Sequence, residues 1–187
     1  MSQPVLQIVI ASTRPGRVGP SVAAWFAEVA RAHGGFEVEV TDLADLDLPF
    51  MDEPNHPRLR HYTHDHTKAW SAVVDRSDAF VFVMPEYNYS FTAPLKNAMD
   101  YLHEEWKHKP VSYVSYGGIS AGLRAVQAFK QVTSTLSMTS TQAAVPIPFV
   151  AQFIDDGVFT ANEIMESGAK ATLEELLALH GALSTLR

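Results

Sequence analysis

Three strands are predicted along the chain, two of them from short, nearly continuous apolar runs. They span residues 5–11, 79–84 and 111–116 and are rich in β-branched and aromatic side chains. Runs that are apolar at nearly every position are typical of strands covered on both faces, as in a parallel sheet. A fourth segment, 36–40, alternates apolar with acidic residues and predicts a strand nearer an edge. The strand signal around 141–145 is weak, because prolines follow it at once.

Between these runs, apolar residues recur every three or four positions, which predicts helices with one buried stripe. The long segment 52–66 lacks such a period and predicts a surface loop with two prolines and four histidines. Thr160 and Glu163 form a capping-box pattern ahead of the last stripe. The expected helices run from Pro20, around Trp70, from Pro94 to Trp106, from about Ser120 to Leu136, and from Ile164 to Leu183.

Strands that alternate with helices in this way predict parallel βαβ units with right-handed crossovers. We therefore expect an α/β fold: a three-layer α/β/α sandwich around a five-stranded parallel sheet, as one domain over residues 1–187. In open sheets of this kind, ligands bind beyond the carboxyl ends of the strands. The loops that follow the three apolar strands should meet there and carry the chemistry.

The loop after the first strand, 12–19, has the residue types of a phosphate site. It offers the hydroxyl of Ser12, the guanidinium groups of Arg14 and Arg17, and backbone amides ahead of a helix that the glycines of the loop leave accessible. It has neither the Gly-x-Gly-x-x-Gly pattern of dinucleotide sites nor the Gly-Lys-Ser/Thr of nucleoside triphosphate sites. A mononucleotide such as FMN therefore fits better, with an arginine-rich turn that merely caps a helix as the alternative.

The loops after the other two strands suit a planar ring. Pro85-Glu86-Tyr87-Asn88 supplies aromatic rings for stacking and an amide for hydrogen bonds. Ser115-Tyr116-Gly117-Gly118 contains glycines that let the backbone approach a flat ligand closely. Taken alone, the first is also consistent with a proline turn at a subunit contact, and the second with an ordinary strand-to-helix turn.

These three loops, together with Leu95-Lys96-Asn97-Ala98, resemble the NADPH-dependent FMN reductase family from Val5 to about Leu136. The resemblance implies a flavodoxin-like fold, FMN as cofactor, NADPH or NADH as cosubstrate, and a small-molecule electron acceptor. It implies no catalytic side chain, because the cofactor carries the chemistry. The residues implied to hold FMN are Ser12, Arg14, Arg17, Val18 and Gly19 at the phosphate, Pro85, Glu86, Tyr87 and Asn88 along the ribityl chain and ring, and Ser115, Tyr116, Gly117 and Gly118 at the border of the ring.

The resemblance also implies a homodimer or homotetramer with the flavin near a subunit interface. The chain departs from the family at Ala11, which replaces a usual glycine, and at Arg17, where many members have a serine. Ordinary packing within one chain is the alternative for each aromatic residue placed at the interface. These candidate interface residues are Tyr89, Phe91, Tyr101 and Trp106.

Composition narrows the function classes. The net charge of −7 argues against a nucleic acid or an anionic membrane surface as partner. The chain has no cysteine, so a catalytic thiol is excluded and redox chemistry needs a cofactor. No apolar segment approaches the length of a membrane span, and we expect a cytoplasmic protein. The histidines between His56 and His66 include metal-ligand types, but loop histidines are usually solvated, and we expect no metal.

Two other functions compete with the reductase. A flavodoxin-type electron carrier or flavin-dependent regulator would bind FMN without nicotinamide turnover, and the acidic charge favours it. Arg14 and Arg17 favour the reductase, because this loop resembles the phosphate loop of the reductases more than the hydroxyl-rich loop of flavodoxins. A hydrolase without flavin ranks last, because the chain has no nucleophile elbow. Quinones, azo compounds, metal oxyanions and free flavin all stay open as acceptors.

Overall fold

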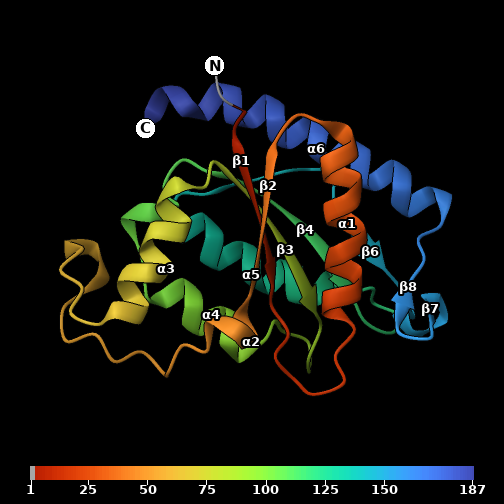
Figure 1. Cartoon of the computed structure of the whole chain (residues 1–187), viewed down its shortest axis with the longest axis horizontal. Helices are drawn as coiled ribbons and strands as arrows, with labels where there is room; N and C mark the ends of the chain where they lie inside the picture. Colours follow the sequence, from red (N-terminus) through yellow and green to blue (C-terminus); the bar gives the residue numbers. More distant parts are fainter. Residues whose placement is uncertain (1–2) are drawn as a thin grey trace.

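The computed structural model describes residues 3–187 and shows a parallel sheet between two layers of helices (Figure 1). All pairings in this sheet are parallel, and two short strands share the fifth position beside the fourth. This is the strand order of a flavodoxin-like sheet, so the predicted fold is confirmed. In spatial order the strands are β2 (Glu37–Asp42), β1 (Val5–Ile10), β3 (Ala79–Pro85), β4 (Pro110–Tyr116), and then β5 (Thr139–Ser140) and β6 (Val145–Ile147).

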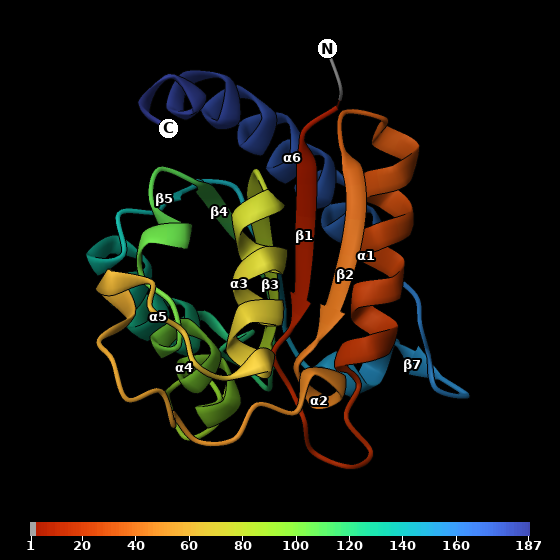
Figure 2. The ribbon, with the colours of Figure 1, turned by 60° about the vertical axis from the view of Figure 1, so that its left-hand side comes forward.

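Helices α1 (Gly19–His33) and α6 (Glu163–Leu183) cover one face of the sheet. Helices α3 (Asp65–Arg76), α4 (Ala93–Asp100) and α5 (Leu123–Thr135) cover the other, as Figure 2 shows. Among the described residues, no helix is both long and apolar enough to cross a membrane. The smaller elements are α2 (Leu43–Leu46), the hairpin of β7 (Ile154–Asp155) and β8 (Val158–Phe159), and 3-10 turns at Pro57–Leu59, Glu104–Trp106, Val150–Phe153 and Ser184–Leu186.

The apolar pattern of the strands explains the two cores. Every residue of β3 is buried, as its continuous apolar run predicts, and every residue of β4 is buried too, although this strand contains Ser112 and Ser115. Strand β2 is only half buried, which agrees with its acidic positions and its place at one edge of the sheet. The side facing α3 to α5 is the more aromatic, with Trp70, Phe82 and Phe129 all fully buried.

Two of the four candidate interface residues are wrong. The helix predicted from Pro94 to Trp106 ends at Asp100, and Trp106 lies in a separate 3-10 turn. The side chains of Tyr101 and Trp106 are 0% exposed because they complete the core of their own chain. Phe91 is half buried, with its ring 5.1 Å from that of Phe129.

Three element boundaries also differ from the expectation. Asn162, not Thr160, caps α6, because its side chain accepts a hydrogen bond from the Met165 amide at 3.0 Å. Helix α5 begins at Leu123, after Gly122 adopts a left-handed φ of 79°. In place of one strand at 141–145 the chain forms β5 just before that segment and β6 from its last residue onward. Pro146 of β6 lies at the outer edge of the sheet, where no partner needs its missing N–H.

Candidate functional site

The three predicted loops meet at the carboxyl ends of the strands, at the bottom of the molecule in Figure 1. The Ala11 amide donates to the Val83 carbonyl at 3.0 Å, which joins the ends of β1 and β3. The Thr92 hydroxyl donates to the Ala11 carbonyl at 2.6 Å and ties the start of α4 to the first loop. The Tyr116 hydroxyl, at the end of β4, donates to Ser12 Oγ at 3.2 Å.

The two arginines of the first loop differ in what they contact. Arg17 donates to both carboxylate oxygens of Asp42, at 2.7 and 2.6 Å, and also to the Ser12 carbonyl. The Arg17 and Asp42 side chains are only 18% and 13% exposed. Arg14 is exposed, and within residues 3–187 its guanidinium donates only to the neighbouring Pro15 carbonyl at 2.9 Å. Arg14 is therefore the guanidinium available to an anion, whereas Arg17 braces the loop.

The start of α1 packs closely against Ser12. A Cβ atom on Gly19 would clash with Ser12 Oγ and lie 2.9 Å from the Tyr116 hydroxyl, so the approach requires glycine. Burial raises the pKa of Tyr116 to about 12, so its hydroxyl keeps its proton and donates to Ser12. Val18 is the N-cap residue of α1. The proton of the Ser12 hydroxyl is thus left for another acceptor at this helix N-terminus.

The second loop is a tight hairpin. The amides of Tyr87 and Ser90 each donate to the other's carbonyl at 2.9 Å. The two central residues, Asn88 and Tyr89, have φ values of 49° and 70°, as a type I′ turn requires. A tyrosine is costly in this left-handed region. The Arg124 guanidinium lies 4.1 Å from the centre of the Tyr89 ring and holds it by a cation–π contact.

Glu86 connects this hairpin to α5. Its carboxylate accepts hydrogen bonds from the Arg124 amide at 3.1 Å and from the Arg124 guanidinium at 3.0 Å. Burial would raise the pKa of Glu86, but hydrogen bonds from Ser120 and Arg124 outweigh it and leave the pKa lowered. The group therefore stays charged at neutral pH and organises the start of a helix.

The third loop is fixed to the segment after β6. The Gly117 amide donates to the Ile147 carbonyl at 3.3 Å, and the Phe149 amide donates to the Gly118 carbonyl at 3.0 Å. Ser115 donates to the Ala121 carbonyl at 2.8 Å. A Cβ atom on Gly118 would meet nothing within 4 Å, so this part of the backbone is open to close approach.

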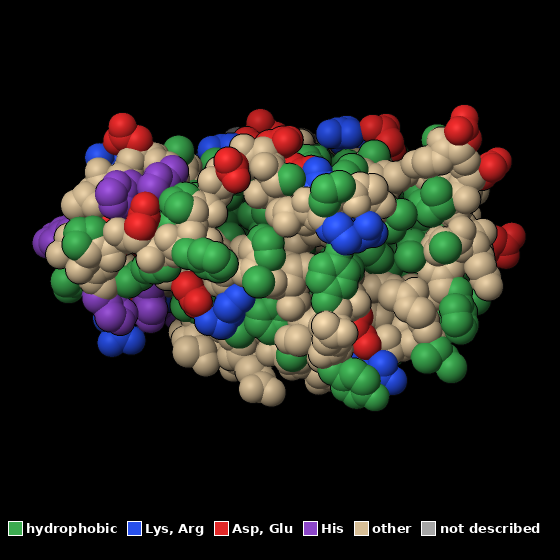
Figure 3. Space-filling view, turned by 90° about the horizontal axis from the view of Figure 1, so that it is seen from below, with side chains coloured by type: hydrophobic (Ala, Val, Ile, Leu, Met, Phe, Trp, Pro, Cys, Tyr) green, Lys and Arg blue, Asp and Glu red, His purple; other side chains and the backbone are tan. Residues whose placement is uncertain are grey.

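Seen from the carboxyl ends of the strands, apolar side chains occupy much of the middle of the face, with basic groups at separate points (Figure 3). Several of these exposed apolar side chains belong to the second and third loops and the segments beside them. A surface of this kind, with a few polar groups at its border, suits a flat aromatic ligand. The exposed apolar side chains of these segments are Tyr87, Tyr89, Ile119, Leu123 and Phe149.

The histidines of the 52–66 segment gather at one end of the same view (Figure 3). The rings of His64 and His66 stack at 5.1 Å, and His66 Nε2 lies 3.0 Å from a carboxylate oxygen of Asp52. In the described part of the chain, no three His, Asp or Glu side chains are grouped so that they could hold a metal ion.

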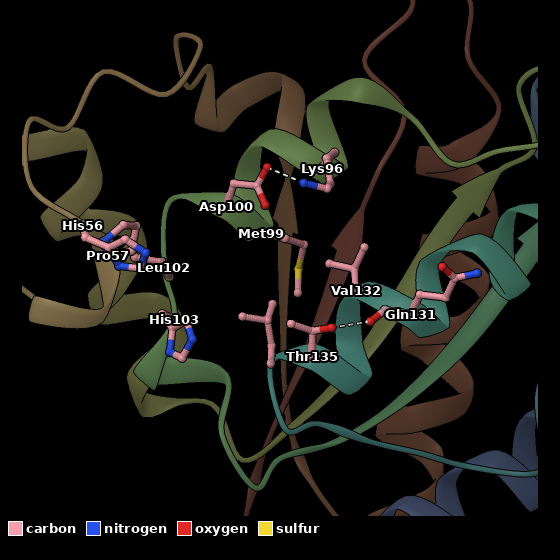
Figure 4. Close-up of a pocket in the computed structure, with 11 residues that line it drawn as sticks. His56, Pro57, Lys96, Met99, Asp100, Leu102, His103, Gln131, Val132 and Thr135 are labelled. Atoms are coloured by element: carbon pink, nitrogen blue, oxygen red, sulfur yellow. Dashed lines mark hydrogen bonds and ion pairs between the residues drawn. The ribbon is translucent and has the colours of Figure 1, made fainter.

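A separate groove of about 510 Å³ lies between α4 and α5 (Figure 4). Apolar side chains such as Met99 and Val132 form part of its wall, and Lys96 and Asp100 form an ion pair of 2.5 Å beside it. None of the residues predicted to bind the cofactor lines it. This groove is therefore distinct from the site at the ends of the strands.

The sequence did not single out Asp42, Thr92 or Arg124, which hold the predicted loops in place. Asp42 ends β2, and the rule that sites form at the carboxyl ends of strands would have pointed to it. Thr92 stands just before the Ala93-Pro94 start of α4, which is a recognisable N-cap pattern. The contact of Arg124 with Glu86 has no local signal, since 38 positions separate them.

The family comparison agrees with this geometry. The NADPH-dependent FMN reductase profile matches residues 5–152. An NAD(P)H-dependent FMN reductase of Schizosaccharomyces pombe is 40% identical over 149 residues, covering 78% of this chain and 74% of the relative. An NAD(P)H:quinone oxidoreductase of Solanum tuberosum is 30% identical, with 95% and 94% covered. FerB, an NAD(P)H:(acceptor) oxidoreductase of Paracoccus denitrificans, shares the fold with a TM-score of 0.76 at 17% identity, over 96% of this chain and 98% of FerB. The chain belongs to the NADPH-dependent FMN reductase family.

Proposed function

We propose that this chain passes reducing equivalents from NAD(P)H through bound FMN to a small acceptor, and that the acceptor is a quinone. One observation carries the proposal. Hydrogen-bond donors that are free to bind a phosphate, around Arg14, lie at the same end of the sheet as an exposed apolar surface. The quinone is favoured because a relative that spans nearly the whole chain is named a quinone oxidoreductase.

The residues present fit the FMN phosphate. Within the described chain, the N–H groups of Thr13, Arg14 and Val18 have no hydrogen-bond acceptor, and they belong to the same loop as the exposed Arg14 guanidinium. Together with the Ser12 hydroxyl and the N-terminus of α1, they would surround a dianion. Gly19 allows this close packing, and Arg17 acts one step away by fixing the loop through Asp42.

The ring would lie between the second and third loops. Pro85 to Asn88 would border one side of it and Ser115 to Gly118 the other, with Tyr87 and the Gly118 backbone nearest to it. When bound, FMN supplies the hydride and electron-transfer chemistry. The protein positions the ring, and the exposed apolar face leaves room for nicotinamide and acceptor to bind in turn.

The predictions of one FMN-binding domain over residues 1–187, of a homodimer or homotetramer, and of a cytoplasmic location belong to the same proposal. The exposure of Tyr89, which is 69%, supports a subunit contact near the hairpin. Light scattering on the FMN-loaded protein tests the oligomeric state directly.

The function is tested by adding FMN to the purified protein, removing the free flavin, and recording the visible spectrum under anaerobic conditions. NADPH and NADH are then added separately, followed by a water-soluble quinone. Loss of the oxidised flavin bands and their return on addition of quinone supports the proposal. Flavin that stays oxidised with both nucleotides would instead indicate a carrier or regulator, and a protein that retains no flavin would refute the proposal.

A further inference from the structure

A second hollow lies beside the third loop, here called the glycine loop (residues 115–122), on the side away from the hairpin of the second loop, here called the tyrosine hairpin (residues 87–90). The hairpin follows β3, whereas the hollow is bordered by the segment after β6, and β4 with its loop lies between them. Its volume is about 410 Å³, which is within the range of small-molecule sites. Its walls come from the glycine loop, the β6 to β7 segment and the start of α6: Ile119, Ser120, Ala121, Leu123, Pro146, Pro148, Phe153, Asn162, Ile164 and Met165.

None of the residues that line the hollow has a charged side chain. Of its two polar members, Asn162 uses its side-chain oxygen to accept from the Met165 amide at 3.0 Å, and Ser120 hydrogen-bonds to Glu86. The remaining lining is aliphatic or aromatic. Such a wall gains free energy from burying hydrocarbon and offers no positive charge to a phosphate or a carboxylate.

The hollow begins where the loop that would border the ring ends. Ile119 and Ser120 line it and directly follow Gly117 and Gly118, which would border the flavin. The side chains of Ile119 and Ile164 are 80% and 81% exposed, so two aliphatic groups at its walls face solvent when the hollow is empty. A ligand whose ring lies over the flavin can therefore extend an attached chain across Ile119 into this hollow.

We propose that this hollow binds the hydrocarbon tail of the acceptor, so that the enzyme selects quinones that carry an alkyl or prenyl chain. The inference rests on the proposed function and defines its substrate class. The reaction is unchanged by the tail. NAD(P)H supplies two electrons and one proton, water supplies the second proton, and the quinone becomes a hydroquinone.

The test compares two quinones with the same ring, one without a tail and one with a ten-carbon chain, on the FMN-loaded enzyme. The expected result is a kcat/KM about tenfold higher for the tailed quinone. An apolar pocket distinguishes substrates by about this factor even when they differ by a single methylene group. In Ile164→Asn this preference should fall by most of that factor, whereas Ile164→Leu should keep it. The matched control is Val158→Asn, since Val158 is 63% exposed but lies outside the hollow.

A binding measurement separates the tail site from turnover. Calorimetric titration with a prenyl alcohol, which has the tail and no quinone ring, should give saturable binding to the FMN-loaded protein, weakened in Ile164→Asn and unchanged in Val158→Asn. Equal kcat/KM for the two quinones, or a preference that Ile164→Asn leaves intact, would overturn the inference. A change of oligomeric state in Ile164→Asn with equal losses on both quinones would also overturn it, because a second copy would then cover the hollow. Failure to oxidise NAD(P)H with the tailless quinone would refute the proposed function itself, which is a different outcome.

Discussion

The loop after β1 and the loop after β3 lie at the same end of the sheet but are held in different ways. In the first, Ser12 is buried and Arg17 is fixed to Asp42 by two hydrogen bonds. In the second, Tyr89 is 69% exposed and two consecutive residues have left-handed φ values. A preorganised anion site loses little entropy when it binds. In the proposed function the exposed hairpin would border the flavin ring, where two substrates would bind in turn.

The largest effect is expected from Gly19→Ala, which disrupts the close contact between the start of α1 and Ser12 in the first loop. The new methyl group would collide with Ser12 Oγ and crowd the Tyr116 hydroxyl, and such overpacking costs about 1–3 kcal/mol. We expect the FMN dissociation constant to rise about a hundredfold, as measured by flavin fluorescence quenching. Gly118→Ala is the control for stability, because its Cβ would meet nothing within 4 Å. Equal melting temperatures for both variants would contradict this account of the loop.

The two arginines of the first loop should affect different properties of the protein. Arg14→Gln should raise the FMN dissociation constant by about twentyfold, the effect of a charge-assisted hydrogen bond to phosphate. It should leave the free energy of unfolding of the flavin-free protein unchanged, because Arg14 is exposed. Arg17→Gln should lower that free energy by about 1–2 kcal/mol, since Asp42 would lose its partner. Urea unfolding and flavin titration of both variants check this, and the opposite assignment of effects would show that Arg17 is the phosphate ligand.

The anchoring of the second loop is tested by pH. Since the pKa of Glu86 is lowered in the fold, its carboxylate stabilises the folded state above its ordinary pKa of 4.5. This contribution is lost as the pH falls below 4.5 through the lower pKa of the folded state. Glu86→Gln should therefore be less stable than wild type by about 1 kcal/mol at pH 7, with a smaller difference in acid. The exposed Glu174→Gln serves as control, and a difference independent of pH would rule out the ionic explanation.

The smallest effect concerns the ring of Tyr89. A double-mutant cycle of Tyr89→Leu and Arg124→Met should give a coupling energy of about 0.5–1 kcal/mol, typical of an exposed cation–π pair. Chemical denaturation of the four proteins measures it. Additive effects would mean that the hairpin is held by its backbone hydrogen bonds alone.

The fold was predictable because the residue types of its central strands indicate that these strands are buried. Strands β3 and β4 are buried at every position, and their short length and their β-branched and aromatic residues favour strands over buried helices. The wrong assignments came from side chains whose environment depends on distant parts of the chain. Nothing local distinguishes an aromatic residue such as Tyr101 at an interface from one in the core. The error at Thr160 arose because two residues that can cap a helix, Thr160 and Asn162, lie only two positions apart.

The candidate site was predictable to the level of its loops. The three loops do converge, because the carboxyl ends of parallel strands share one edge. The roles within the loops were not predictable from residue type. Arg14 and Arg17 are chemically alike, and only the position of Asp42, 25 residues beyond Arg17, distinguishes them.

Pro146 has a consequence for how copies of this chain can assemble. It lies on the outer strand of the sheet, where its missing N–H interrupts any row of donors offered to a further strand. The opposite edge, β2, carries Glu37 and Glu39, whose charges disfavour the approach of another apolar strand. Both margins are thus protected against edge-to-edge aggregation. Any oligomer is expected to form through helices and loops rather than by extending the sheet from one subunit into the next.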